Sequence, residues 1–286
     1  MIKNQIKTVL LLGGLTGLFL FIGAFLGGQS GMLIALLLAG GMNFVSYWWS
    51  AKIVLWMYKA KEADRKKYAQ VYTIVKEIAH TAHLPMPKVY IIETPQANAF
   101  ATGRNPEHAV VAVTAGILDL LNQKELRGVL AHEMGHVKNR DILISTIAAT
   151  IAGVISYLAM MARWAAIFGG IGGNDRDRGS GLIELIVLAV IAPLMAMIIQ
   201  LAITRSREYL ADETGAHLVK DPESLASALE KIEKNVQHHP FARMGTTNAT
   251  AHLFISNPLK ASSFLELFST HPATKKRAER LRNMKI

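Results

Sequence analysis

The stretch that decides the fold spans residues 122–138 and reads Asn-Gln-Lys-Glu-Leu-Arg-Gly-Val-Leu-Ala-His-Glu-Met-Gly-His-Val-Lys. Asn122 and Glu125 form a capping-box pattern, which predicts that a helix begins directly after Asn122. His132 and His136 lie four residues apart in this helix, so both side chains project from the same face. We therefore expect a helix that presents two imidazoles to one point in space.

The histidine pair, together with the glutamate after its first member, is typical of a zincin-like metal site. Both imidazoles can bind one Zn²⁺, whereas Glu133 is rotated far enough to miss the metal and to reach a water molecule on it. Zinc can lower the pKa of that water towards about 7, and a carboxylate can then take its proton. The alternative is a pair of surface histidines on an ordinary helix. The spacing on a capped helix favours one zinc ion per chain.

A zincin needs a third protein ligand and leaves the fourth position for water. Residues 205–219 predict a second helix on which Glu208 and Asp212 lie one turn apart. If Glu208 binds the metal, Asp212 is placed to hydrogen-bond a ligand histidine. His217 is a rival ligand, and a solvated acidic face paired with neighbouring arginines is the structural alternative.

The composition points to a membrane protein. The 286 residues are 51% hydrophobic and 18% charged, with 31 Lys and Arg, 21 Asp and Glu, and no Cys. This balance excludes a disordered chain and a disulfide-stapled secreted protein. Four uncharged stretches are each long enough to cross a bilayer as a helix: residues 8–27, 31–50, 142–162 and 185–204. A cleaved signal peptide is the alternative for the first stretch, and a buried or interfacial helix pair for the last two.

Positive charges flank both predicted hairpins, whereas the turns inside them carry no net charge. The positive-inside rule therefore places both ends of each hairpin in the cytosol. We expect a mainly α fold with a small β-sheet, in which a zincin-like domain is combined with four transmembrane helices in two hairpins. The first hairpin is expected at residues 1–51 and the second at residues 142–204. The first part of the domain, with the histidine helix, is expected at residues 52–141. The second part, with the third zinc ligand and a basic helix, is expected at residues 205–286.

Three motifs resemble those of the HtpX family of membrane zinc metalloproteases, which is related to the CAAX prenyl endopeptidases and the Oma-type proteases. They are HEMGHVKNRD at residues 132–141, SREYLAD at residues 206–212 and HPAT at residues 271–274. The likeness covers essentially the whole chain. The resemblance implies that the zinc ligands are His132, His136 and Glu208. It implies that Glu133 is the general base, and that His271 and Arg277 stabilise the oxyanion.

The resemblance also implies a biological setting. It places the protein in the bacterial inner membrane, with a cytosolic catalytic domain that cleaves misfolded or surplus membrane proteins in quality control and stress response. Self-cleavage is compatible with the family. The lipid bilayer is an expected partner and nucleic acid is not, because the basic C-terminal segment lacks a nucleic-acid-binding motif. The alternative function is a non-proteolytic membrane chaperone or adaptor with a structural zinc site.

Two further expectations concern the surroundings of the metal. Asn98, Ala99 and Phe100 belong to a turn-rich segment whose extended neighbour could offer backbone groups to a peptide substrate by strand addition. Only a few residues separate the predicted metal ligands from the second predicted hairpin. We therefore expect both metal-bearing helices to run directly from that hairpin, which would place the site about 5–10 Å from the bilayer surface.

Overall fold

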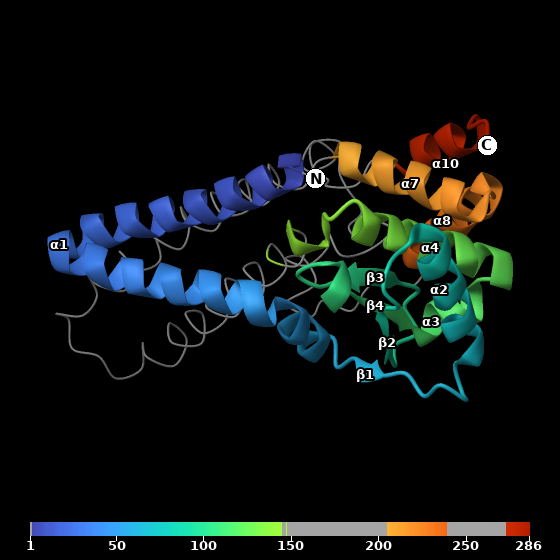
Figure 1. Ribbon diagram of the computed structural model, residues 1–286, viewed down its shortest axis with the longest axis horizontal. Coiled ribbons are helices and arrows are strands. Elements are labelled where there is room, and N and C mark those ends of the chain that lie inside the picture. Colours follow the sequence, from blue (N-terminus) through green and yellow to red (C-terminus); the bar gives the residue numbers. More distant parts are fainter. Residues whose placement is uncertain (1, 145–146, 148–204, 239–272) are drawn as a thin grey trace.

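The computed structural model describes residues 2–144, 147, 205–238 and 273–286, and all structural statements below refer to these residues. They form a long helical hairpin joined to a helix-rich domain with one small sheet (Figure 1). This architecture confirms the prediction of a mainly α fold with a small sheet. Nearly all of the predicted second hairpin, residues 142–204, lies outside the described residues, as does His271.

The first hairpin is the element α1 (Ile2–Met57), whose helix breaks at Gly27 and Gly28. Gly28 has a φ of 57°, in the left-handed region that a glycine adopts without strain. Two antiparallel arms result, and they lie side by side in Figure 1. The turn therefore forms where the sequence predicts it, between the first two uncharged stretches.

Small residues bring the two arms of α1 into contact. A Cβ added at Gly31 would lie 2.2 Å from the carbonyl oxygen of Gly23, so only glycine allows this approach. Large apolar side chains instead point outwards, and Leu37 is 77% exposed. Packing through small residues with apolar side chains outside is typical of helices in lipid. By length and composition, Gly27–Met57 could cross a membrane and is the one such helix among the described residues, so the other three spans stay predictions.

The sheet has the strand order β1-β2-β4-β3. Its central strands β2 (Lys88–Ile92) and β4 (Val110–Thr114) are parallel, whereas the outer strands β1 (Lys61–Glu62) and β3 (Ala99–Thr102) run antiparallel to their neighbours. Residues 88–93 and 109–114 are rich in β-branched residues and predict the two central strands. The sequence does not predict β3, which occupies most of the segment interpreted as a turn and forms an edge of the sheet.

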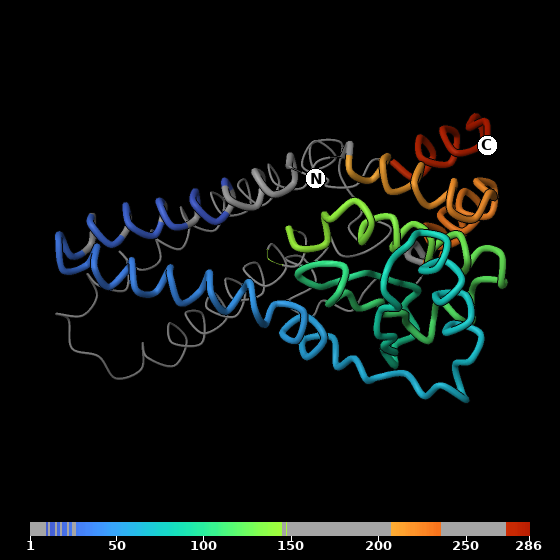
Figure 2. Tube along the Cα trace, viewed as in Figure 1, coloured from blue at the N-terminus to red at the C-terminus, as the bar shows by residue number. Residues whose placement is uncertain are grey.

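The sheet separates two apolar clusters. On one face, residues such as Val111 and Val113 pack with α2 (Ala69–Ala82), α4 (Gln123–Lys138) and α8 (Pro222–His238) in the main core. On the other face, Phe100 and Ala112 pack against the end of α1. The remaining helices are α3 (Ala115–Leu120), the short 3₁₀ helix η1 (Pro106–His108), α7 (Arg205–Val219) and α10 (Thr274–Arg282). Figure 2 shows that α7, far from α4 in sequence, runs beside it.

The prediction that the histidine helix runs directly into the second hairpin is wrong. α4 ends at Lys138, and Arg140 adopts a φ of 56°, outside the range of a right-handed helix. Helical structure resumes only at Ile142. The turn returns the chain towards its own helix, since the Asp141 amide donates to the carbonyl of His136 at 3.2 Å.

The N-terminus of α4 is tied to α8 by Glu125, which is 4% exposed. Its carboxylate accepts hydrogen bonds from the Asn122 amide, the Ser227 hydroxyl at 2.7 Å and the Lys231 ammonium at 2.8 Å. Burial alone would raise the pKa of Glu125, but these three bonds outweigh it and hold the pKa below its ordinary value. The carboxylate is therefore ionised and fully paired at neutral pH.

We expect Glu125→Ala to lower the free energy of unfolding by about 1–3 kcal/mol. The change removes a capping box and leaves Ser227 and Lys231 without their hydrogen-bond acceptor. An acidic group whose pKa is lower in the folded than in the unfolded protein stabilises the folded state at pH values above its unfolded-state pKa. This stabilisation is lost as the pH falls through the folded-state pKa. The difference from wild type, measured by denaturant unfolding, should therefore shrink in acid. Lys124→Ala, at an exposed neighbouring position, is the control. Equal stability of the two variants at neutral pH would contradict the assignment.

Candidate active site

The candidate metal centre lies where α4 and α7 touch through glycine. A Cβ added at Gly215 of α7 would lie 2.7 Å from the backbone nitrogen of His132. One added at Gly135 of α4 would lie 2.9 Å from the carbonyl oxygen of Ala211. Both distances are shorter than any ordinary carbon contact. The two helix backbones are therefore in direct contact, and this brings Glu208 of α7 within reach of the histidines of α4.

Three potential ligands meet at this contact: His132, His136 and Glu208. The two histidine Nε2 atoms are 3.2 Å apart, and the Glu208 carboxylate oxygens lie 3.8 Å from the first and 3.7 Å from the second. Ligands about 2.0–2.1 Å from a tetrahedral zinc ion are separated by roughly 3.3 Å, close to these distances. The arrangement confirms that the predicted histidine pair and Glu208 come together.

Each histidine has a carboxylate behind it. His132 Nδ1 lies 2.9 Å from Asp212 Oδ1, and His136 Nδ1 lies 3.1 Å from Asp141 Oδ1. A carboxylate at Nδ1 holds the proton there and leaves the lone pair of Nε2 for a metal. The partnership between Asp212 and a ligand histidine agrees with the sequence expectation, whereas Asp141 was not assigned a role from the sequence.

Two buried arginines complete the support. Arg277 donates to both oxygens of Asp212, at 2.9 and 2.7 Å, and its Nη1 lies 3.6 Å from Glu208. Arg207 donates to Asp141 Oδ2 at 3.2 Å and to the Asp141 carbonyl oxygen at 2.6 Å. Burial opposes ionisation of Asp212, yet Arg277 and His132 outweigh it and lower its pKa to about 2. Both aspartates are therefore held as anions.

The charges of this cluster fit a divalent cation. Four buried carboxylates, those of Glu133, Asp141, Glu208 and Asp212, surround the two histidines, and two buried arginines face them. The formal charge of −2 that remains is the charge that Zn²⁺ cancels. Two imidazoles and one carboxylate are also a donor set that catalytic zinc sites use. The same negative charge also favours a proton on His136. Burial disfavours the charged imidazole, but the nearby Asp141 carboxylate outweighs this effect and raises the pKa of His136 to about 9.

Glu133 lies between the ligands and the edge strand β3. It is 5% exposed, and its Oε2 accepts a hydrogen bond of 2.9 Å from the backbone amide of Ala101. Burial is the main influence on this carboxyl group and raises its pKa. A buried carboxylate with a raised pKa beside a metal site is suited to accept and return a proton.

The predicted substrate-binding segment lies on the same strand. Asn98 directly precedes β3, and its carbonyl oxygen accepts from the Thr114 amide at 3.0 Å on the neighbouring strand. Ala99 is buried within β3. The Phe100 ring points the other way, 5.5 Å from the ring of Tyr58, the residue after α1. Its side chain therefore packs against the end of the hairpin.

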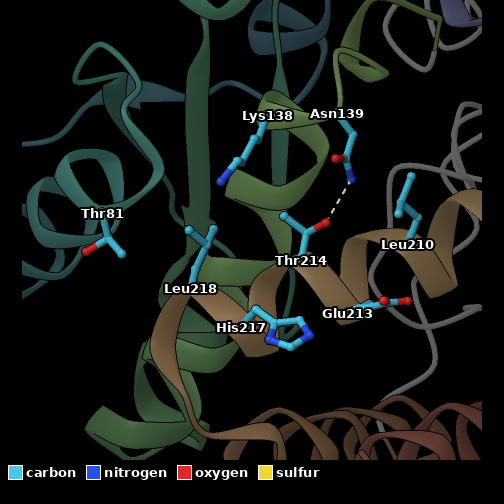
Figure 3. A pocket seen from close by; sticks show the side chains of 8 residues that line it. All are labelled: Thr81, Lys138, Asn139, Leu210, Glu213, Thr214, His217 and Leu218. Carbon is cyan, nitrogen blue, oxygen red and sulfur yellow. Dashed lines mark hydrogen bonds between the residues drawn. The ribbon is translucent and has the colours of Figure 1, made fainter. Parts of the chain in front are cut away.

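The remaining candidates from the sequence are His217, Arg277 and His271. His217, the rival ligand, is not part of the ligand group. It lines a separate cavity of about 430 Å³ whose walls include Lys138, Glu213 and Thr214 but none of the three metal ligands (Figure 3). The cavity is therefore not the candidate active site. Arg277 is 2% exposed and bonded to Asp212, and His271 lies outside the described residues.

We expect Gly215→Ala to weaken zinc binding, because the new methyl group pushes α7 away from the His132 backbone and carries Glu208 with it. The same change in an open helix would stabilise by about 0.5–1 kcal/mol, so a loss is diagnostic. Gly41→Ala, where the added Cβ meets nothing within 4 Å, is the matched control. Competition with a chromophoric chelator measures both affinities. Unchanged zinc affinity in Gly215→Ala would contradict the close-contact account.

Asp141→Asn should lower zinc affinity about 10–100-fold, because the neutral amide no longer holds the proton on His136 Nδ1 electrostatically. The same chelator competition provides the measurement. Asp119→Asn, at an exposed position on α3, should bind zinc as the wild type does. If Asp141→Asn also does so, Asp141 has no part in orienting the ligand.

Comparison with known proteins identifies the family. Residues 65–285 match Peptidase family M48. A protein described as "Protease HtpX homolog" from Desulforapulum autotrophicum is 55% identical over 280 residues, which cover 98% of this chain and 90% of that protein. The protein of the same description from Aquifex aeolicus is 54% identical over 268 residues, covering 93% of this chain and 88% of that protein.

A solved structure shares the fold. The crystal structure of Ste24p from S. mikatae matches with a TM-score of 0.52 at 16% identity, covering 98% of this chain and 66% of that chain. At this identity the likeness concerns the fold alone. The family match spans the histidine helix, α7 and α10, which are the elements that build the metal centre. The chain belongs to peptidase family M48 and is a metalloprotease.

Proposed function

We propose that this metalloprotease holds one zinc ion with His132, His136 and Glu208 and cleaves membrane proteins at segments on the cytosolic side of the membrane. The observation that supports this most strongly is the convergence of three ligand atoms next to a buried glutamate and the strand β3. The apolar hairpin joined to the same domain supports action at a membrane. Misfolded or surplus membrane proteins are the proposed substrates, in quality control under stress.

The chemistry is divided between the metal and the protein. When bound, zinc polarises the scissile carbonyl and makes water acidic. Glu133 accepts a proton from the attacking water and later returns it to the leaving amine. The Ala101 amide holds the Glu133 carboxylate in position through its 2.9 Å hydrogen bond. Burial by the surrounding core excludes bulk water from this carboxylate, so the proton is transferred within the site.

The substrate is proposed to bind as an added strand along β3. Among the described residues, β3 pairs with β4 and stands last in the strand order. The Ala101 amide points away from β4, because it donates to Glu133. A peptide laid along this edge would bring its backbone towards Glu133 through main-chain hydrogen bonds, which suit substrates of varied sequence. We therefore assign backbone contacts to Ala99, which has the same strand orientation as Ala101. The Asn98 backbone is bonded to Thr114, so Asn98 is assigned to fixing the start of β3, and Phe100 to packing β3 on the end of α1.

The two oxyanion candidates differ in their surroundings. The contacts of Arg277 with Asp212 and Glu208 support a positioning role for the metal ligands. His271 remains the proposed oxyanion residue, by the family resemblance and the chemistry of a histidine donor. The non-proteolytic chaperone is the less favoured function, because the chain belongs to a peptidase family and has a glutamate beside an incomplete set of three ligands.

The proposed location is the inner membrane of a bacterium, with several spans and the catalytic domain in the cytosol. Support comes from the α1 hairpin, whose exposed apolar side chains need a lipid environment. Lysines on both sides of that hairpin favour cytosolic ends. The helix α7 begins on the side of the domain from which the hairpin extends (Figure 1).

We expect Glu133→Gln to keep one zinc per chain and to lose about 10²–10⁴-fold in cleavage rate, because the amide cannot accept the proton. Elemental analysis and cleavage of a membrane-protein substrate in detergent measure the two properties. Glu62→Gln, at an exposed position on β1, is the matched control. Cleavage that survives in Glu133→Gln would overturn the proposed mechanism, and loss of zinc would show that Glu133 supports the metal instead.

A further inference from the structure

The turn between β3 and β4 contacts the aromatic end of the membrane hairpin. The Arg104 guanidinium lies over the ring of Trp48 in α1, 4.4 Å from the ring centroid. Arg104 also donates to Nε2 of His108 in η1 at 2.7 Å. An arginine stacked on a tryptophan in this way gains a cation–π attraction and keeps a fixed orientation. A cation of the catalytic domain is thus held against the hairpin.

The sequence of α1 indicates the depth, relative to the bilayer, at which Arg104 contacts Trp48. Large apolar side chains are exposed along the second arm, and the aromatic residues Tyr47, Trp48 and Trp49 follow near the end of its uncharged part. The Tyr47 and Trp48 rings are in edge contact, 5.4 Å apart. The first charged residue of the arm is Lys52. Tryptophan and tyrosine gather where hydrocarbon meets headgroups, so Arg104 lies at that level.

The same face of α1 continues with polar and aromatic groups. Trp48, Lys52 and Trp56 follow each other at a spacing of four residues, which places them in one row along the helix. Lys52 is exposed and Trp56 is 79% exposed. The row is about 12 Å long, which covers the headgroup layer of about 5–8 Å on one side of a bilayer.

We propose that Trp48, Lys52, Trp56 and Arg104 form an interface patch that binds the phosphate headgroups of the phospholipid bilayer and holds the β3–β4 turn against the membrane. The guanidinium offers five donors in a planar fork that matches a phosphate, and Trp48 holds that fork in place. The lysine adds a second cation one turn along the helix, and the two tryptophans insert at the headgroup level. We assign phospholipid headgroups as the ligand because the patch is continuous with the exposed apolar surface of the hairpin, which lies in the bilayer.

The consequence for the enzyme concerns substrate position, and it rests on the proposed function of a membrane protease. Arg104 is three residues from Ala101, which is about 10 Å along a strand. Ala101 donates to Glu133, and Phe100, directly before Ala101, packs on Tyr58 just after α1. The interface patch therefore fixes the height of the substrate-binding edge above the bilayer. Segments of a substrate that leave the membrane close to the protease are the ones that reach this edge.

The test uses the absence of native cysteine. Single cysteines at Glu107 in η1 and at Asp119 in α3 carry a polarity-sensitive fluorophore in the full-length protein. Both positions are exposed, and Figure 1 shows α3 farther from the hairpin than the sheet. The protein is reconstituted in vesicles of phosphatidylethanolamine and phosphatidylglycerol. Quenching by headgroup-labelled nitroxide lipid and by an aqueous quencher is compared at the two positions.

We expect the label at Glu107 to be quenched by the nitroxide lipid and shielded several-fold from the aqueous quencher, relative to the label at Asp119. Equal aqueous quenching at both positions would overturn the proposal. This outcome is independent of proteolysis, so failure of the proposed cleavage chemistry would be seen separately in the Glu133→Gln assay.

A second variant tests the role of Arg104 itself. Arg104→Gln removes a surface cation and should shift the equilibrium between docked and undocked turn by about fivefold, which raises aqueous quenching at Glu107. Arg127→Gln, a half-exposed arginine of α4 that pairs with Glu77, should leave that quenching unchanged. If the two variants behave alike, Arg104 does not make the contact.

Discussion

The metal centre depends on the close approach of two helices. α4 carries both histidines and α7 carries Glu208, and only glycine at position 215 lets the second backbone touch the first. Side chains as short as glutamate reach a metal shared with a neighbouring helix only when the helix axes are near each other. This requirement explains why glycine, otherwise a poor helix former, occurs inside both helices.

Electrostatic balance is the second condition for the site. Four carboxylates are buried within a few ångströms of two histidines, and burial of unpaired charge would cost several kcal/mol for each ion. Arg207 and Arg277 compensate part of this charge, and a divalent metal compensates the rest. Arg207 stands beside the third ligand in α7, and Arg277 belongs to the C-terminal helix α10. The metal therefore joins segments that the predicted second hairpin separates in sequence.

Local signals predicted the parts of the site that lie within single helices. The capping box at Asn122 and the spacing of His132 and His136 are properties of one helix, and the structure has both. The sequence also predicted the break in α1, because Gly-Gln-Ser at residues 28–30 separates two uncharged stretches that are each long enough to span a bilayer. Contacts that depend on an irregular turn or on segments distant in sequence were harder to predict. Asp141 reaches His136 through a turn that needs the unusual φ of Arg140, which no residue preference indicates.

The strand β3 was missed for a similar reason. All four of its residues are buried on both faces, so it lacks the alternation by which a half-exposed strand is recognised. One face meets the main core and the other meets α1, and both partners are remote in sequence. The pairing of each arginine with an aspartate is likewise a tertiary contact. A sequence can supply the residues of such pairs without indicating which of them meet.

Anomalous diffraction at the zinc absorption edge from crystals of the zinc-loaded protein tests the central claim most directly. The account predicts one peak per chain that is bound by Nε2 of His132, Nε2 of His136 and the Glu208 carboxylate, with Asp212 and Asp141 on the Nδ1 atoms behind them. A peak held by His217, or a centre that lacks Glu208, would contradict it.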